Sequence, residues 1–131
     1  MTDVMLDTNI VSALVDDPGG AVAARLAALT TPASVSVVVA GELRYGAAKK
    51  ASPRLTAAVE RVLGVLATES LAPPVDLIYA ALRDRLERSG LPMGANDLLI
   101  AAHALTLDRL LVTHDAAFAR VPGLRVEDWL M

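Results

Sequence analysis

The stretch V-M-L-D-T-N-I-V-S-A-L, from Val4 to Leu14, decides the fold class of this chain. Its first three residues are apolar and typical of a buried strand, and a helical pattern begins at Thr8. Asp7 stands between the two, directly after the apolar run. Because a buried charge without a partner is costly, we expect the fold to bring a partner to Asp7 from elsewhere in the chain.

The composition favours one α/β domain. The chain has 131 residues, of which 54% are hydrophobic and only 3% aromatic, so Ala, Val, Leu and Ile must build the core. A chain of this length buries about two thirds of its unfolded surface. Helices packed on a sheet suit such a core, and we expect a single domain over residues 1–131.

Cysteine usage and hydropathy bear on the compartment. No cysteine is present, which excludes disulfides, thiolate metal sites and cysteine nucleophiles. No apolar run approaches the ~20 residues that span a bilayer, and no basic leader precedes the first strand. We therefore expect a cytoplasmic protein that does not act at a membrane.

Strand and helix patterns alternate along the sequence. We expect strands over residues 4–6, 33–35, 68–71, 110–113 and 124–126, and helices over residues 8–14, 21–29, 37 onward, 53–66, 74–88 and 96–107. Residues 33–39 also fit a longer strand, but Ser36 is a good cap for a helix that begins at Val37. Asn96 is a good cap for the last helix. Strands that alternate with helices pair in parallel, which predicts an α/β sandwich.

Four acids are the candidate functional residues. Asp7 and Asp115 each follow an apolar strand, and functional residues gather at the carboxyl ends of strands in an open parallel sheet. Asp97 lies in the first turn of an apolar helix, and Glu42 lies among apolar residues of another helix. Four carboxylates crowded together repel one another, so such a cluster needs a cation. Ligands that are all oxygen select Mg²⁺ or Mn²⁺ over zinc.

Each acid also has an ordinary structural interpretation. Asp7 can cap the helix that begins at Thr8, and Asp97 can interact with the dipole of its own helix. Asp115 can be a turn residue, and Glu42 can lie on a solvated helix edge. All four interpretations must hold together for the acids to have no common function, and this makes the cluster the stronger hypothesis.

Five motifs in order resemble those of one protein family. They are L-D-T-N-I (6–10), V-A-G-E-L-R-Y-G-A (39–47), G-A-N-D-L-L-I-A-A-H-A (94–104), L-V-T-H-D-A-A-F (111–118) and V-P-G-L-R-V-E-D-W (121–129). Together they resemble the PIN-domain ribonucleases, and specifically the VapC-type toxins of type II toxin-antitoxin systems. The resemblance covers the chain from end to end. It implies a PIN-like three-layer α/β/α sandwich with a central, mostly parallel sheet.

The resemblance also implies a site. Its catalytic and metal-binding acids are Asp7, Glu42, Asp97 and Asp115, with Asp7 and Asp97 as the leading direct ligands of Mg²⁺ or, as a substitute, Mn²⁺. The polar residues that match the family's supporting positions are Thr8, Asn9, Asn96 and Thr113. His114 departs from the Asn or Asp more usual beside the last acid, and we interpret it as a neutral histidine in a surface turn.

The activity implied by the resemblance is metal-dependent cleavage of RNA phosphodiester bonds, in a transfer, ribosomal or messenger RNA. The implied partners are a cognate antitoxin that neutralises the toxin and a second copy of the chain, in a homodimer or a toxin-antitoxin hetero-oligomer. The net charge of −3 argues against a protein that coats nucleic acid. Outside the four acids, however, eleven acids face twelve bases, so RNA is not excluded.

The densest basic stretch offers a place for the RNA backbone. It comprises Arg44, Lys49, Lys50 and Arg54, which can hold phosphates near the site. The same residues also suit a solvated helix end, where the dipole favours cations.

Two other classes of function remain open. A haloacid-dehalogenase-like phosphatase also has an apolar strand that ends in a nucleophilic aspartate, here Asp7. That class places a second aspartate two residues later, where this chain has Asn9. A non-catalytic PIN-fold binding module could keep the fold and the acids, and metal-dependent RNA cleavage would distinguish it from a nuclease.

Overall fold

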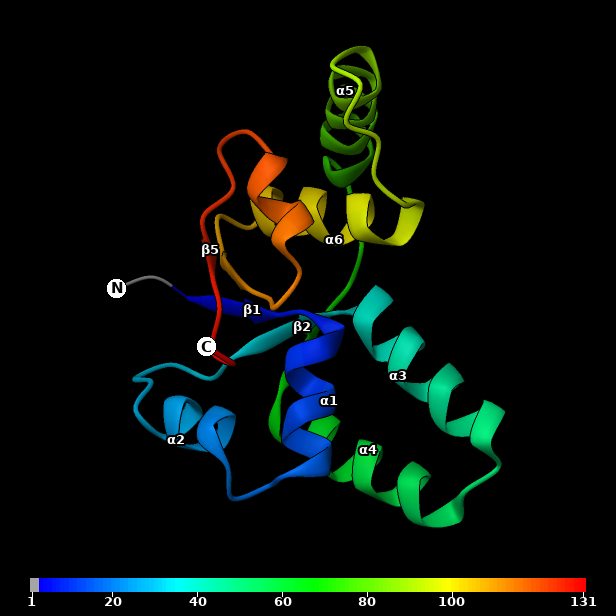
Figure 1. The fold of residues 1–131 in the computed structure, drawn as a ribbon, viewed down its shortest axis with the longest axis vertical. Helices are drawn as coiled ribbons and strands as arrows, with labels where there is room; N and C mark the ends of the chain where they lie inside the picture. The colour runs from blue at the N-terminus through cyan, green and yellow to red at the C-terminus, as the bar shows by residue number, and fades with distance from the viewer. Residues whose placement is uncertain (1–2) are drawn as a thin grey trace.

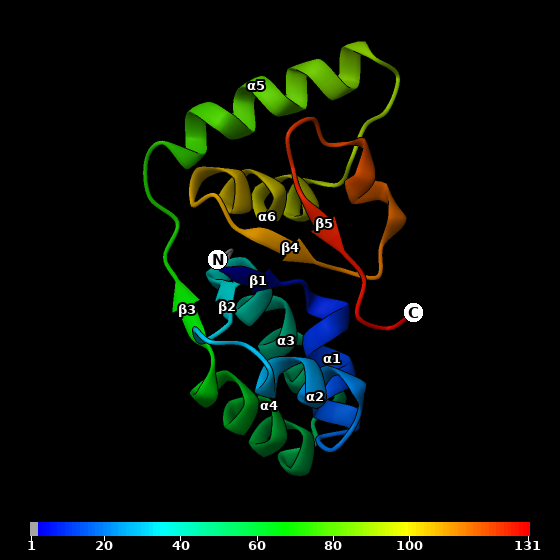
Figure 2. The ribbon, with the colours of Figure 1, turned by 90° about the vertical axis from the view of Figure 1, so that its left-hand side faces the viewer.

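The computed structural model describes residues 3–131 and contains a five-stranded parallel sheet between two layers of helices (Figures 1 and 2). The strands are β1 (Val4–Leu6), β2 (Ser34–Ser36), β3 (Ala67–Glu69), β4 (Leu110–Val112) and β5 (Val126–Glu127). Their order in the sheet is β3-β2-β1-β4-β5, and every described pair is parallel. The predicted α/β/α sandwich is confirmed.

The helices divide between the two faces of the sheet. Figure 2 shows α5 and α6 on one side, and the other four helices on the opposite side. The helices are α1 (Thr8–Asp16), α2 (Ala21–Ala27), α3 (Val37–Lys50), α4 (Pro53–Val65), α5 (Val75–Arg88) and α6 (Ala95–Thr106), and a short 3₁₀ helix, η1, spans Ala116–Arg120. None of the helices within residues 3–131 is long and apolar enough to span a bilayer.

Aliphatic side chains fill the core, as the composition predicts. Met5, Leu6 and Leu111 on the two central strands are fully buried. The chain's one phenylalanine, Phe118 in η1, is also fully buried and closes the core beside β4. A central strand covered by helices on both faces reads as a continuous apolar run, which is why β1 and β4 were evident from sequence.

Helix starts follow side-chain capping chemistry at Ser36 and Ser52 and depart from it at α6. The Ser36 hydroxyl accepts a hydrogen bond from Val38 N and caps α3. The Ser52 hydroxyl likewise caps α4. The prediction that Asn96 caps α6 is wrong, because the helix already begins at Ala95 and Gly94 occupies the cap position in an extended conformation.

Strand bounds differ from expectation where pairing decides them. β2 includes Ser36 because that residue pairs with Glu69 of β3. β3 is three residues long and begins at Ala67 rather than residue 68, since its register is set by β2. Such bounds depend on the neighbouring strand, and local sequence does not contain that information.

The strand order creates a crevice at one edge of the sheet. The chain leaves β1 toward β2 on one side, whereas β4 lies on the other side of β1. At such a switch point the connections diverge and leave an opening beyond the carboxyl ends of the strands. Asp7 follows β1 there, and Thr113 follows β4.

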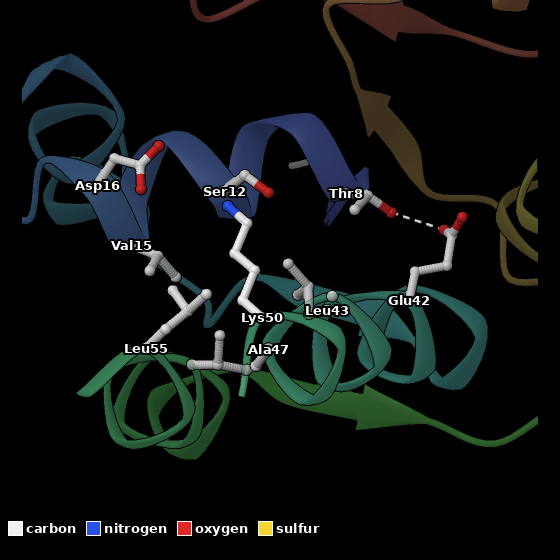
Figure 3. A pocket seen from close by; sticks show the side chains of 11 residues that line it. Thr8, Ser12, Val15, Asp16, Glu42, Leu43, Ala47, Lys50 and Leu55 are labelled. Carbon is white, nitrogen blue, oxygen red and sulfur yellow. Dashed lines mark hydrogen bonds between the residues drawn. The ribbon is translucent and has the colours of Figure 1, made fainter. Parts of the chain in front are cut away.

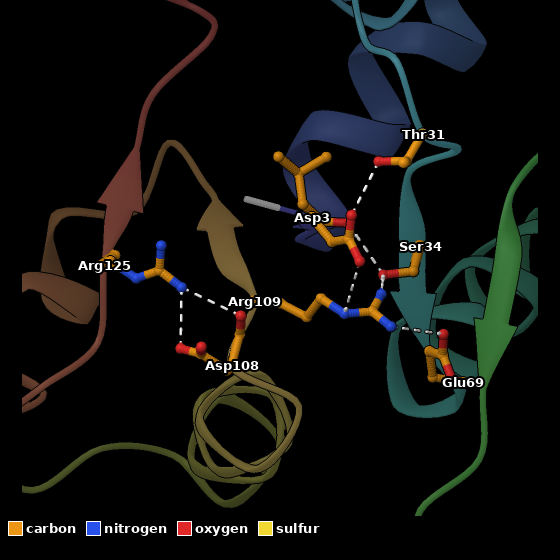
Figure 4. Close-up of polar contacts among 8 residues, drawn as sticks. Asp3, Thr31, Ser34, Glu69, Asp108, Arg109 and Arg125 are labelled. Carbon is orange, nitrogen blue, oxygen red and sulfur yellow. Dashed lines mark hydrogen bonds and ion pairs between the residues drawn. The ribbon is translucent and has the colours of Figure 1, made fainter. Parts of the chain in front are cut away.

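Arg109 links several strands through one side chain (Figure 4). Its Nη1 donates to Ser34 Oγ at 2.9 Å, its Nη2 pairs with Glu69 Oε1 at 3.3 Å, and its Nε lies 4.0 Å from Asp3 Oδ2. Only 19% of the Arg109 side chain is exposed. The guanidinium therefore connects residues at β1, β2 and β3 to the start of β4.

Candidate active site

Asp7 is the buried centre of the site. The residue is 4% exposed, and both of its carboxylate oxygens are hydrogen-bonded. Thr8 N donates to Oδ1 at 2.8 Å, and the hydroxyl of Thr113 donates to Oδ2 at 2.7 Å. The expected partner from elsewhere in the chain is thus Thr113, which β4 brings alongside β1. Asp7 also caps α1, so the structural interpretation and the functional one coexist.

Thr113 connects two of the acids. Its hydroxyl donates to Asp7 and accepts from the backbone N–H of Asp115 at 3.0 Å. Asp115 in turn caps η1 by accepting from Ala117 N at 2.9 Å. One buried hydroxyl therefore fixes the position of the Asp115 backbone relative to the Asp7 carboxylate.

Glu42 reaches the site from α3. It is half-buried, and its Oε1 accepts a hydrogen bond from the hydroxyl of Thr8 at 2.7 Å. The sequence offered Glu42 no partner within a turn of its own helix. The partner lies 34 residues away on α1, and the contact brings the second turn of α3 beside Asp7.

Asp97 enters from the opposite helical layer. It lies in the first turn of α6, as expected, and is half-buried. Burial and then the charges of Asp7, Asp115 and Glu42 raise the pKa of Asp97 from 3.8 to about 6. The charges of the other three candidate acids thus all act on the Asp97 carboxyl group.

The same crowding acts on Asp7. Burial raises the pKa of Asp7, and the hydrogen bonds from Thr113 and Thr8 oppose the rise. The charges of Glu42 and Asp115 raise it further. Among the described residues, the groups that shift the pKa values of Asp7 and Asp97 include no lysine or arginine. An acidic cluster of this kind favours a bound cation.

The donor set suits a hard divalent ion. Carboxylate oxygens are the preferred ligands of Mg²⁺, which is commonly held by one or two carboxylates and several waters. Among residues 3–131, no three Asp, Glu or His side chains are grouped closely enough to hold an ion unaided. The carboxylate oxygens therefore suit an ion whose coordination is completed by water.

Further hydrogen bonds hold the segment that follows β4 in place. Asn9 Oδ1 accepts from the backbone N–H of His114 at 3.1 Å, and His114 Nδ1 lies 2.8 Å from Asp128 Oδ2. Thr113 N donates to Glu127 O at 2.9 Å. His114 is exposed, as expected, but it also ties this loop to the segment after β5. Thr8, Asn9 and Thr113 thus contact the acids or the segments that carry them.

The basic residues singled out from sequence separate into two groups. Arg44 forms two hydrogen bonds of 2.9 Å with Glu60 of α4, so its charge is directed away from the acids. Lys49, Lys50 and Arg54 are exposed at the end of α3 and the start of α4. Lys50 lines a pocket that also includes Thr8 and Glu42 (Figure 3).

A family model gives a match over most of the chain. The model of the PIN domain matches residues 4–124, a span that includes all four candidate acids. The chain belongs to the PIN domain family. The five-stranded parallel sheet is therefore that of a PIN domain.

Two relatives place this PIN domain in the VapC group. It is 36% identical over 129 residues to Ribonuclease VapC2 of Rickettsia felis, which covers 95% of this chain and 96% of that protein. It is 32% identical over 131 residues to the tRNA(fMet)-specific endonuclease VapC of Salmonella typhimurium, with coverage of 98% and 99%. The resemblance to VapC-type proteins is thus confirmed.

A solved structure agrees with this assignment. The PIN domain superposes with a TM-score of 0.91 on a chain of VapBC2 from Rickettsia felis, a complex bound to a DNA fragment from its promoter. The identity is 32%, and the match covers 96% of this chain and 98% of that chain. The fold expected from the sequence motifs is the fold of this relative.

The phosphatase alternative is not favoured. The chain belongs to the PIN domain family, and a relative that covers 95% of it is named a ribonuclease. Asn9 stands where that class has its second aspartate, and its side chain accepts from the His114 backbone.

The structure adds two polar residues that the sequence analysis did not single out. Ser12 and Asp16 follow Thr8 at intervals of four residues, so all three lie along one face of α1. All three line the pocket that includes Glu42 and Lys50. The four-residue spacing of polar residues is the signal by which they could have been found.

Proposed function

We propose that this PIN domain is a divalent-metal-dependent endoribonuclease, the toxin of a toxin-antitoxin pair. The observation that carries the proposal is the group of four carboxylates beyond the ends of β1 and β4, where burial and the neighbouring acids raise the pKa values of Asp7 and Asp97. Membership of the VapC group supports RNA as the substrate, because one curated relative is named a ribonuclease and another a tRNA(fMet)-specific endonuclease.

The acids have distinct roles in this proposal. Bound Mg²⁺, or Mn²⁺ in its place, would polarise the scissile phosphate and lower the pKa of water. Asp7 and Asp97 hold the ion, and Glu42 and Asp115 complete the negative site. Thr113 orients Asp7, and Thr8 orients Glu42, through the hydrogen bonds described above. The pKa of Asp97 is raised to about 6 when no cation is bound. A proton therefore competes with the ion for the Asp97 carboxylate as the pH falls toward that value.

Transfer RNA is the first substrate class to test. One relative, at 32% identity over nearly its full length, is named as specific for tRNA(fMet). We expect Lys49, Lys50 and Arg54 to contact the RNA backbone, and Arg44 to remain with Glu60. Asn96 is exposed beside Asp97, where it can contact RNA or a water ligand.

An antitoxin is the proposed protein partner. The structural relative is a VapBC complex, which supports a hetero-oligomer. We expect this protein to act in the cytoplasm, where its RNA substrate is. An arginine of the antitoxin would pair with carboxylates of the site and so replace the charge of the ion. Co-expression with the antitoxin should relieve growth arrest. A complex that is unaffected by neutralising Glu42, Asp97 and Asp115 together would contradict inhibition through this site.

The test of the nuclease activity is cleavage of purified transfer RNA, with sequencing of the cut ends. Cleavage should require Mg²⁺ or Mn²⁺ and stop in EDTA. Asp7→Asn and Asp97→Asn should each remove most of it, whereas Asp84→Asn, an exposed aspartate of α5, serves as the matched control. Wild-type turnover by either site variant would refute the ligand assignment. Binding of metal without cleavage of any RNA would favour the non-catalytic module.

A further inference from the structure

Of the residues that the structure describes in α6, His103 is the one polar residue that is buried. The other residues that this helix buries are apolar: Leu98, Ile100, Ala101, Ala102 and Ala104. His103 is 1% exposed, and its Nδ1 lies 2.8 Å from the hydroxyl oxygen of Ser36. Its Nε2 has no hydrogen-bond partner among residues 3–131. A buried ring with one unpaired nitrogen costs stability, so packing alone does not explain a histidine at this position.

Ser36 connects this contact to α3. The serine is fully buried at the junction of β2 and α3, and its hydroxyl caps α3 by accepting from Val38 N at 3.2 Å. A hydroxyl that accepts one hydrogen bond still has its own proton to donate, here to His103 Nδ1. The contact therefore joins two helices that lie on opposite faces of the sheet (Figure 2). Within residues 3–131, it is the one hydrogen bond between a side chain of α6 and another element.

Two acids of the cluster lie at equal sequence separations from this contact. Glu42 follows Ser36 by six residues on α3, and Asp97 precedes His103 by six residues on α6. At a rise of about 1.5 Å per residue, each acid lies ~9 Å along its helix from the contact. A tilt of ~10° about the contact would move an acid by ~1.5 Å, which exceeds the ~0.2 Å tolerance of metal-ligand distances.

Apolar packing does not fix this angle by itself. The hydrophobic effect has no direction, and most of the buried face of α6 is alanine and aliphatic carbon. A hydrogen bond weakens steeply when its angle changes, so the contact between His103 and Ser36 resists rotation of α6 relative to α3.

We propose that His103 is a positioning residue that acts through Ser36. The contact holds Asp97 of α6 and Glu42 of α3 at the separation that a divalent ion requires. This inference rests on the proposed metal-dependent function.

Binding of Mn²⁺ to the metal-free protein tests this role without RNA, by isothermal titration calorimetry at neutral pH. His103→Leu has a similar volume but removes the hydrogen bond with Ser36. It should weaken Mn²⁺ binding about 10-fold, the lower end of the effect of outer-shell partners on metal affinity. His103→Asn keeps a polar atom at the position of Nδ1, so it should bind Mn²⁺ nearly as tightly as the wild type.

Urea unfolding separates positioning from a merely structural role. His103→Asn leaves a cavity where the rest of the ring was, so it should be less stable than His103→Leu although it binds Mn²⁺ more tightly. Thr106→Val is the matched control, because it removes a 2.7 Å hydrogen bond from Thr106 to Ala102 O within α6, and it should bind Mn²⁺ like the wild type. The proposal is overturned if His103→Leu binds Mn²⁺ as tightly as the wild type, or if metal affinity simply follows stability across these variants.

A double variant tests whether His103 acts through Ser36. Ser36→Ala removes the same hydrogen bond from the side of α3. Mn²⁺ binding by Ser36→Ala, His103→Leu should be no weaker than that of the weaker single variant, because both substitutions remove one interaction. Additive losses of Mn²⁺ affinity would refute action through Ser36.

Cleavage assays separate this proposal from the function on which it rests. If the variants bind Mn²⁺ in the expected order but the wild type cleaves no RNA, the proposed function fails and the positioning role stands. If the wild type cleaves, His103→Leu should raise the Mg²⁺ concentration for half-maximal rate and leave KM for RNA unchanged, because His103 is buried away from RNA. A raised KM with unchanged Mg²⁺ dependence would refute the positioning role and leave the nuclease intact. A wild type that binds no Mn²⁺ would overturn both.

Discussion

Replacing Asp97 by Asn should stabilise the metal-free protein at neutral pH. The folded state raises the pKa of Asp97 from 3.8 to about 6, through burial first and then the three neighbouring acids. A difference of this size in proton affinity corresponds to at most ~3 kcal/mol of destabilisation by the ionised carboxylate. Asp97 is half-buried and loses a favourable helix-dipole interaction on replacement, so we expect a net gain of ~1 kcal/mol.

The sign of the pH dependence follows from the raised pKa. Below pH 3.8 the carboxyl is protonated in both states, and Asp97→Asn then gives no electrostatic gain. Between 3.8 and about 6 the folded state keeps the proton and the unfolded state loses it, so the gain grows with pH and is complete above about 6.

Urea unfolding in EDTA measures this gain. The free energy of unfolding of wild type and Asp97→Asn is compared at pH ~4 and pH ~7.5, with Asp84→Asn as a surface control expected to lie within ~0.5 kcal/mol of wild type. Millimolar Mg²⁺ at neutral pH should then stabilise the wild type more than Asp97→Asn, because the ion binds the native carboxylates. The reasoning is refuted if Asp97→Asn is no more stable than wild type at neutral pH, or if the gain is the same at both pH values.

Three further outcomes are expected. Thr113→Val keeps the shape of a fully buried side chain but removes the hydrogen-bond donor to Asp7. It should lower the free energy of unfolding by ~1–3 kcal/mol and reduce metal-dependent cleavage. Unchanged cleavage would rule out orientation of Asp7 by Thr113. Burial lowers the pKa of His103 below 6.5. Its neutral ring therefore contributes stability above pH 6.5 that is lost as the pH falls through the folded-state pKa. An NMR titration of the ring with a midpoint at or above 6.5 would contradict this. Arg109→Met leaves Glu69 and Asp3 without their shared cation and should lower the free energy of unfolding by ~1–3 kcal/mol, measured by thermal or urea unfolding. Arg125 is more exposed, so Arg125→Gln should lower it by ~0.5 kcal/mol or less. Equal losses of stability would argue against the linking role of Arg109.

The sequence contains most of what sets the core and the acids. β1 and β4 are apolar runs followed by polar residues, and Asp7 and Asp115 lie beyond their ends as expected. The helix cap at Ser36 was also readable, because a serine before an apolar helical run has a local physical reason. Features of this kind depend on neighbours in the chain.

Features that depend on distant neighbours were missed or misplaced. The sequence predicted Arg44 to be part of a basic cluster, but in the fold it is hydrogen-bonded to Glu60 of α4. Asn96 was predicted as the cap because asparagine is a stronger N-cap residue than glycine, but the helix begins at Ala95, with Gly94 as a cap that makes no side-chain hydrogen bond. The partner of Asp7 was expected but could not be named, since the pairing of β1 with β4 selects Thr113.

The pairing of β1 with β4 also sets when the site can exist during synthesis. Asp7 and Thr113 are separated by 106 residues, and the ribosome needs ~5–20 s to add that many. Throughout this interval the nascent chain holds the first acid but neither its hydroxyl donor nor the strand that carries Asp115 into place. The acidic cluster is therefore completed only after nearly the whole chain has been synthesised.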